Sequence, residues 1–193
     1  LQSFDLRRSP VRWYWWLVAA GLYPAMVALG SGISAAIGLQ AWSSKTAAPV
    51  HLLALDVLLT GLLYIFHGGG LEEPGWRGFA LPLLMRRYNP LRASLFLAMA
   101  WAAWHAPLIP GGLVGLAAYF LVVVAPLTIL FTVVYSLTRG SLPVVILLHI
   151  SINLASVYLP ESTLSTVLWL LLAIGLAVWM WRSPQRFAAP EAD

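Results

Sequence analysis

The longest uncharged stretches of this sequence limit what it can fold into. No charged residue lies between Arg12 and Lys45, and none lies between Arg92 and Arg139. A helix needs about 20 apolar residues to cross a bilayer, so the first stretch has room for one crossing and the second for two. The chain is 61% hydrophobic and 9% charged, whereas soluble domains are about 45–50% apolar and about 25% charged. We therefore predict an integral membrane protein whose surroundings are a lipid bilayer.

Apolar segments separated by charges, glycines and prolines predict an all-α fold. The second stretch should turn at Pro110-Gly111-Gly112, because proline and glycine end helices. The segment 50–85 is interrupted by Gly68–Gly70 and carries acids and an arginine, so we predict one long, broken helix there. The expected fold is a polytopic transmembrane helical bundle of about six spans, forming a single domain over 1–193 with a polar tail at 183–193. The expected spans are 13–39, 50–85, two within 93–138, 142–158 and 163–181.

Basic residues predict the orientation of this bundle, because cytoplasmic loops are enriched in Lys and Arg. If 50–85 crosses once, the arginine clusters fall on one side with both termini cytoplasmic, Lys45 falls opposite, and Arg77 lies within the membrane. The clusters form no basic stripe, so we expect no nucleic-acid partner. The first apolar run has no small-residue cleavage site and is expected to be a retained span rather than a signal peptide. The clustered arginines are Arg7, Arg8, Arg12, Arg86, Arg87, Arg92, Arg139, Arg182 and Arg186.

Four polar side chains within the predicted spans lie at similar depths. Ionisable groups are costly in lipid and face protein or a wet cavity when they occur there. Counting from the cytoplasmic arginines Arg86, Arg92 and Arg139 at about 1.5 Å per residue puts all four roughly 15–21 Å from the cytoplasmic end. We therefore expect them to share one site. They are Glu72, His105, His149 and Asn153.

The spacing of the remaining polar residues assigns them partners. Glu73 and Arg77 are four residues apart on a helix, which suits an ion pair and leaves Glu72 to project elsewhere. Trp101 and His105 share one helix face, as do His149 and Asn153. A carboxylate with one histidine can activate a water, while a second histidine and an amide stabilise the oxyanion of amide hydrolysis. Cysteine is absent, which excludes a thiol nucleophile.

Three motifs carry a resemblance to a known family. They are the EExxxR pattern at 72–77, an FxxxH pattern at 101–105 with tryptophan in place of phenylalanine, and HxxxN at 149–153. In this order and spacing, over about 50–158, the chain resembles the CAAX protease and bacteriocin-processing (CPBP) family of intramembrane proteases, relatives of the Ras-converting CAAX endopeptidase. The resemblance implies a membrane-embedded endopeptidase, in a bacterial inner membrane, acting on a peptide or protein substrate that enters from the membrane or the cytoplasmic side.

The resemblance also implies residue roles. Glu72 and His105 would activate the water, and His149 and Asn153 would form the oxyanion hole. Glu73 and Arg77 would support the first motif, and Trp101 would place a ring beside the histidine. We expect no cofactor, with zinc held by Glu72, His105 and His149 as the alternative.

Two functions of other classes compete with the peptidase. One is a non-enzymatic bacteriocin-immunity or binding protein on the same scaffold, and the other is a small proton-coupled transporter. Complete motifs argue against the first, and the absence of paired half-helix repeats argues against the second. Asp56 is a charged residue inside a predicted span without an assigned role, while His51 and His67 are expected to fill gaps or lie at an interface.

Overall fold

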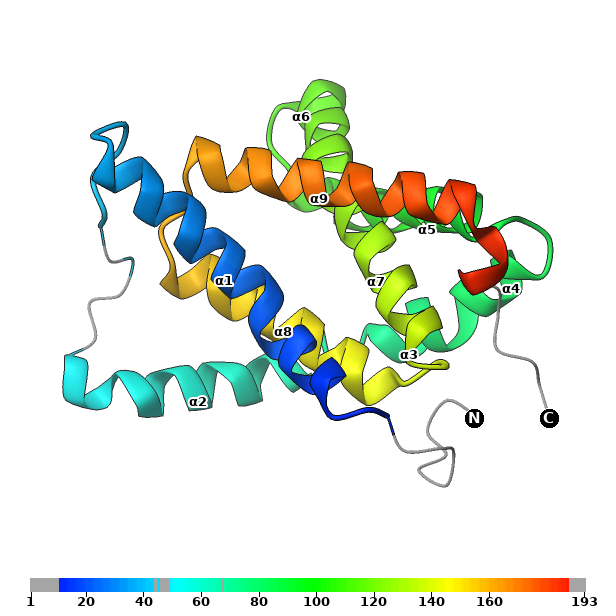
Figure 1. The fold of residues 1–193 in the computed structure, drawn as a ribbon, viewed down its shortest axis with the longest axis horizontal. Coiled ribbons are helices and arrows are strands. Elements are labelled where there is room, and N and C mark those ends of the chain that lie inside the picture. The colour runs from blue at the N-terminus through cyan, green and yellow to red at the C-terminus, as the bar shows by residue number, and fades with distance from the viewer. Residues whose placement is uncertain (1–10, 44, 46–48, 67, 188–193) are drawn as a thin grey trace. The chain divides into compact units, whose positions relative to one another are not determined.

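The computed structural model describes residues 11–43, 45, 49–66 and 68–187. Within these residues every regular element is a helix and no strand occurs (Figure 1). The expectations for Arg7, Arg8, His67 and the end of the polar tail lie outside the described residues.

Each of the six segments that the sequence predicts as a span contains helix within the described residues. Among the described residues, three helices are long and apolar enough to cross a membrane, namely Tyr14–Ala36, Gly112–Leu137 and Thr163–Arg182, and two shorter apolar helices are His51–Phe66 and Leu142–Tyr158. The predicted all-α fold is confirmed. The elements are α1 (Tyr14–Ala36), α2 (Val50–Phe66), α3 (Glu73–Gly75), η2 (Trp76–Ala80), α4 (Leu81–Met85), α5 (Pro90–His105), η3 (Ala106–Leu108), α6 (Gly112–Tyr119), η4 (Phe120–Val124), α7 (Ala125–Leu137), α8 (Leu142–Tyr158), α9 (Thr163–Arg182) and η5 (Pro184–Phe187).

Both predicted interruptions are present, and glycine makes each of them. After α2, Gly68 and Gly69 have φ angles of 85° and 111°, in the region that side chains disfavour. Before α6, Gly111 and Gly112 have φ angles of 86° and 58°. The broken helix and the second turn are therefore confirmed.

The chain also contains two wider turns that hydropathy does not predict. The π-helical turn η2 follows α3 and includes Arg77, and the π-helical turn η4 joins α6 to α7. A π turn inserts an extra residue into a helix, and such turns occur often at functional sites. The first of the two begins at Trp76, within the EExxxR segment, and extends beyond it to Ala80.

The chain divides into two compact units, which we describe separately. The first unit holds 74–142 and 170–193 together with 1–5, and the second holds 6–73 and 143–169. The helix α9 contributes residues to both units. The single domain predicted over 1–193 stays a prediction.

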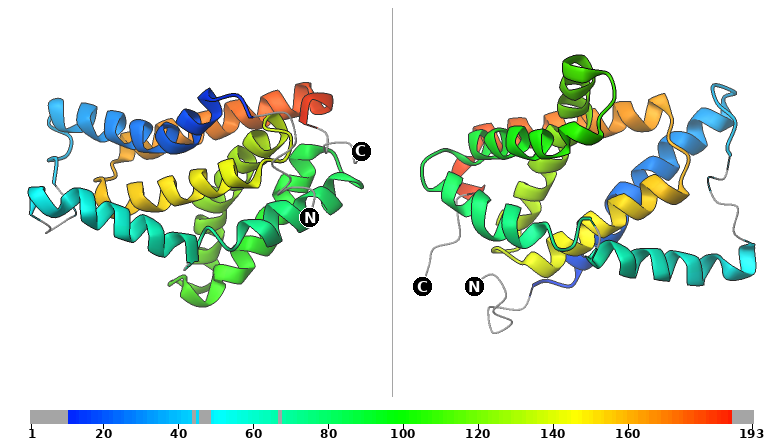
Figure 2. Two further views of the ribbon diagram at one scale, coloured as in Figure 1. Left: turned by 90° about the horizontal axis from the view of Figure 1, so that it is seen from below. Right: turned by 180° about the vertical axis from the view of Figure 1, so that it is seen from behind.

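In the second unit, α8 lies alongside α1 (Figure 1) and alongside α2 (Figure 2). Ser151 of α8 donates a hydrogen bond from Oγ to the Ala19 carbonyl of α1 at 2.7 Å. At the other end of α1, a Cβ on Gly30 would stand 2.5 Å from the Cα of Ser165. Only glycine allows these backbones to approach so closely, which brings the start of α9 against α1.

Asp56 has a polar partner inside the second unit. Tyr158 of α8 donates its hydroxyl hydrogen to Asp56 Oδ2 at 2.8 Å. Thr60 Oγ1 lies 2.8 Å from the same tyrosine oxygen, and because that oxygen has already donated its one hydrogen, Thr60 must be the donor here. The charged residue without a role in the sequence thus joins α2 to α8.

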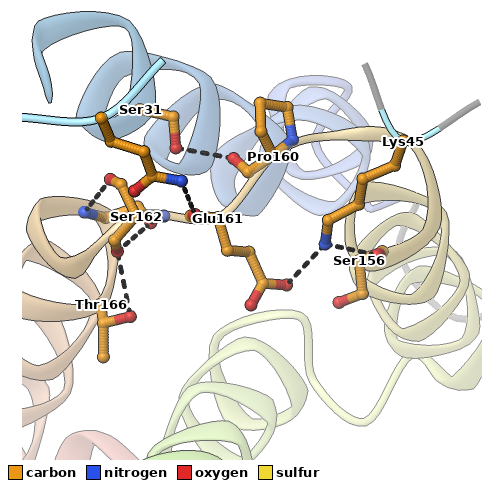
Figure 3. A network of polar contacts seen from close by, with 9 residues as sticks. Ser31, Lys45, Ser156, Pro160, Glu161, Ser162 and Thr166 are labelled. Atoms are coloured by element: carbon orange, nitrogen blue, oxygen red, sulfur yellow. Dashed lines mark hydrogen bonds and ion pairs between the residues drawn. The ribbon is translucent and has the colours of Figure 1, made fainter. Parts of the chain in front are cut away.

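The turn between α8 and α9 is held by a polar network (Figure 3). Ser31 Oγ donates to the Pro160 carbonyl at 2.6 Å. Lys45 Nζ donates to the Ser156 carbonyl at 3.0 Å and lies 3.8 Å from Glu161 Oε1. Because the lysine and the glutamate are partly exposed, their ion pair contributes little by itself, and the backbone contacts position the turn.

In the first unit, α5 pairs with α7 through a buried hydrogen bond from Ser94 Oγ to Thr132 Oγ1 at 2.8 Å. The short helix η5 after α9 folds back onto α7, where Ser136 Oγ donates to the Phe187 carbonyl at 3.1 Å. An apolar cluster stabilises this end of the unit. Its buried members are Ile129, Val133, Met180 and Phe187.

Candidate active site

A buried carboxylate and a buried imidazole meet in the second unit. Glu73 Oε1 lies 2.6 Å from His149 Nδ1. The Glu73 side chain is fully buried, and His149 is 6% exposed. Glu73 begins α3, directly after the glycine break, and His149 lies midway along α8. Because a buried polar atom is costly to leave without a hydrogen-bond partner, this contact satisfies Glu73 Oε1 and His149 Nδ1 together.

Asn153 lies one helical turn beyond His149, on the same side of α8. The two side chains face the glycine break, since a Cβ on Gly69 would stand 2.9 Å from Asn153 Nδ2 and 3.3 Å from His149 Cδ2. Asn153 Nδ2 also donates a long hydrogen bond of 3.4 Å to the Gly68 carbonyl. The shared face predicted for His149 and Asn153 is confirmed, and the glycine backbone covers it.

A substitution at Gly69 tests how closely the glycine backbone packs against His149 and Asn153. We expect Gly69→Ala to destabilise the protein by about 2–3 kcal/mol, because a side chain at a φ of 111° is strained and meets Asn153. Gly68→Ala is the matched control, since Gly68 also has a positive φ but no heavy atom within 4 Å, so it should cost only about 1 kcal/mol. Unfolding of both variants by titration with a denaturing detergent measures the difference. Equal losses for the two variants would contradict the proposed packing.

In the first unit, Arg77 is fully buried between two aromatic rings. Its Cζ lies 4.4 Å from the centre of the Trp101 ring and 4.2 Å from that of Phe131. A guanidinium over an aromatic face gains cation–π energy that grows as water is excluded. Arg77 lies on the π-helical turn η2, Trp101 on α5 and Phe131 on α7, so the arginine joins three elements of this unit.

His105 follows Trp101 by one turn at the end of α5. The two rings meet edge to face with centres 5.8 Å apart, so the ring that the sequence predicts beside the histidine is confirmed. His105 Nδ1 lies 2.9 Å from the Trp101 carbonyl. A carbonyl only accepts hydrogen bonds, so Nδ1 carries the hydrogen, and Nε2 has a lone pair whenever the ring is neutral. The ring of Tyr119 lies 6.0 Å away.

The predicted site residues are distributed between the two units. Glu72, Glu73, His149 and Asn153 belong to the second unit, whereas Arg77, Trp101 and His105 belong to the first. Glu72 is half-buried in the turn before α3. The common site and the ion pair between Glu73 and Arg77 stay predictions.

Some contacts of the candidate residues have no counterpart in the sequence analysis. The contact of Glu73 with His149 joins residues far apart in the chain, and Phe131 and Tyr119 belong to no motif. A helical spacing rule finds partners three or four residues away, so it could not find these.

The described residues contain no group of three or more His, Asp or Glu side chains arranged to hold a metal ion. His149 Nδ1 is already in contact with Glu73. The zinc alternative draws Glu72 and His149 from the second unit and His105 from the first. It therefore stays a prediction, and we derive no step through a metal.

The fold and these contacts define a helical membrane protein with a buried Glu–His pair. Residues 54–155 match the family model described as type II CAAX prenyl endopeptidase Rce1-like. The match covers more than half of the chain, and the chain belongs to this family. It is also 47% identical over 38 residues to "CAAX prenyl protease 2" of Methanococcus maripaludis. That alignment covers 20% of this chain and 14% of the relative.

Proposed function

We propose that this chain is a membrane-embedded endopeptidase that hydrolyses a peptide bond of a protein or peptide substrate. The observation that carries the proposal is membership of the Rce1-like family over 54–155, the segment that contains all three motifs. The buried contact between Glu73 and His149 supports it, because it joins the first motif to the third. The proposed location is a bacterial inner membrane, with both termini in the cytoplasm.

The proposed mechanism divides four side chains between two tasks. The Glu72 carboxylate, assisted by His105, removes a proton from water as the water attacks the substrate carbonyl. The lone pair at His105 Nε2, inferred from its contact with the Trp101 carbonyl, suits this task. His149 and Asn153 donate hydrogen bonds to the oxyanion that forms. Collapse of the tetrahedral intermediate then breaks the C–N bond, and the amine leaves with the proton.

The proposed substrate class follows from the descriptions of the family and of the relative, both of which name CAAX prenyl substrates. Such a substrate is a peptide whose lipid-modified cysteine lies near the C-terminus. A lipid chain partitions into the bilayer by about 0.8 kcal/mol for each buried CH₂, so it would deliver the peptide to a membrane-embedded enzyme.

A direct assay tests the proposed function. The purified protein in nanodiscs is incubated with a peptide ending in a farnesylated CAAX sequence and with the same peptide lacking the lipid, and mass spectrometry follows release of the last three residues. We expect cleavage of the lipidated peptide and slow or no cleavage of the other. Tight binding of both peptides without cleavage would favour the non-enzymatic binding protein instead.

A further inference from the structure

The contact between Glu73 and His149 determines which nitrogen of the imidazole can react. At 2.6 Å, Glu73 Oε1 and His149 Nδ1 must share a hydrogen, because two lone pairs at this distance would repel. An ionised carboxylate has no hydrogen to give. A neutral His149 beside it therefore carries its one hydrogen on Nδ1, and Nε2 presents a lone pair.

This assignment has a consequence for the oxyanion hole. Nε2 can donate to an oxyanion only when the ring carries a second hydrogen, and the ring is then positively charged. In both forms Nδ1 carries a hydrogen that it can donate to Glu73 Oε1, so the contact with Glu73 is kept. Which nitrogen of a functional histidine reacts is commonly set by the hydrogen bond that the other nitrogen makes, often to a carboxylate.

We propose that Glu73 is a positioning residue that holds His149 with its hydrogen on Nδ1 and leaves Nε2 as the reacting nitrogen. This inference deepens the proposed function and rests on it for the role of Nε2. It also gives the two adjacent glutamates separate tasks. Glu72 acts on the water, whereas Glu73 acts through His149.

The packing around His149 supports a single orientation of the ring. A Cβ on Gly69 would stand 3.3 Å from His149 Cδ2, the carbon bonded to Nε2. The same Cβ would stand 3.4 Å from His149 Cγ, so the glycine backbone lies against the Cγ–Cδ2 side of the ring, while Glu73 engages Nδ1. A flipped ring would lose the contact with the carboxylate. Glu73 and Gly69 together therefore hold the ring with Nδ1 toward Glu73.

Nitrogen-15 NMR of the histidine rings tests the assignment without relying on activity. Protein labelled at its histidines is prepared in nanodiscs, and the His149 signals are identified by their absence from His149→Asn. We expect wild-type His149 to carry hydrogen on Nδ1, and Glu73→Ala to shift its hydrogen toward Nε2, as in free imidazole. Asp56→Asn is the matched control, because Asp56 is an acid of the same unit bonded to Tyr158, and it should leave the His149 signals unchanged. A wild-type ring with a bare Nδ1, or a Glu73→Ala spectrum identical to that of the wild type, would overturn the proposal.

Kinetics then separate the positioning role from the proposed function. Loss of a partner that orients a metal-binding histidine typically costs about 10–100-fold. We expect Glu73→Ala to lower kcat by a similar factor with little change in KM, because the ring is no longer held in one orientation toward the substrate. If Glu73→Ala fails to fold, Glu73→Gln provides the same comparison, because it keeps the size of the side chain and removes the charge. If the wild type cleaves no peptide but the NMR result holds, the proposed function fails and the positioning of His149 stands. An unchanged kcat in an active enzyme would overturn the positioning role.

Discussion

Replacing Glu72 by glutamine is expected to lower the rate of peptide cleavage by about 10³-fold, with the protein still folded in the membrane. A glutamine amide has nearly the same shape as the carboxylate but cannot accept a proton. Removal of a general base typically costs about 10²–10⁴-fold. Glu72 is half-buried in the turn before α3, so the substitution disturbs no tightly packed core. Initial rates with the farnesylated peptide measure the loss.

The control for this result is another glutamate of the same unit. Glu161→Gln removes an acid whose partner is Lys45, 3.8 Å away and partly exposed, and it should cleave at the rate of the wild type. Cleavage by Glu72→Gln at the rate of Glu161→Gln would show that Glu72 is not the base. Loss of cleavage by both variants would mean that the assay reports folding rather than chemistry.

Arg77→Ala is expected to destabilise the protein by about 3–5 kcal/mol, an effect on folding rather than on chemistry alone. The guanidinium is fully buried between the rings of Trp101 and Phe131. A desolvated cation–π contact contributes about 2 kcal/mol, and truncation of a large buried side chain leaves a cavity with a cost of its own. The free energy of unfolding in a denaturing detergent measures the loss.

Arg77→Lys separates charge from shape in the same pocket. Lysine keeps the positive charge but lacks the planar group that stacks on aromatic rings, so its stability should fall between those of the wild type and Arg77→Ala. Phe131→Leu, which removes one of the two rings, should weaken the same contact. A free energy of unfolding for Arg77→Ala within about 0.5 kcal/mol of the wild type would contradict the stacked arrangement, since changes of that size are typical of exposed sites.

Much of the secondary structure could be predicted because membrane helices carry strong local signals. Charge gaps located the helices, and glycine marked the interruptions after Phe66 and before α6. The π-helical turn at Trp76–Ala80 was missed, because a single inserted residue leaves the hydropathy of a segment unchanged. The choice of partners across the fold was harder still.

The two adjacent glutamates illustrate that difficulty. Helical spacing directs Glu73 toward Arg77, whereas the structure brings Glu73 to His149 on a different helix. Local spacing cannot indicate which of two neighbouring acids faces the interior, because this depends on how the chain leaves the glycine break. The motifs identified the candidate site residues. Their partners on other helices could be identified only from the structure.

The central claim is that residues of separate motifs act in one reaction, and a double-mutant cycle on the first two motifs tests it most directly. Cleavage of the farnesylated peptide is measured for Glu72→Gln, His105→Asn and the variant with both changes. Groups that act as one catalytic unit show strongly non-additive losses, so we predict that the double variant cleaves about as fast as the slower single variant. Losses that multiply, or wild-type cleavage by His105→Asn, would contradict the account.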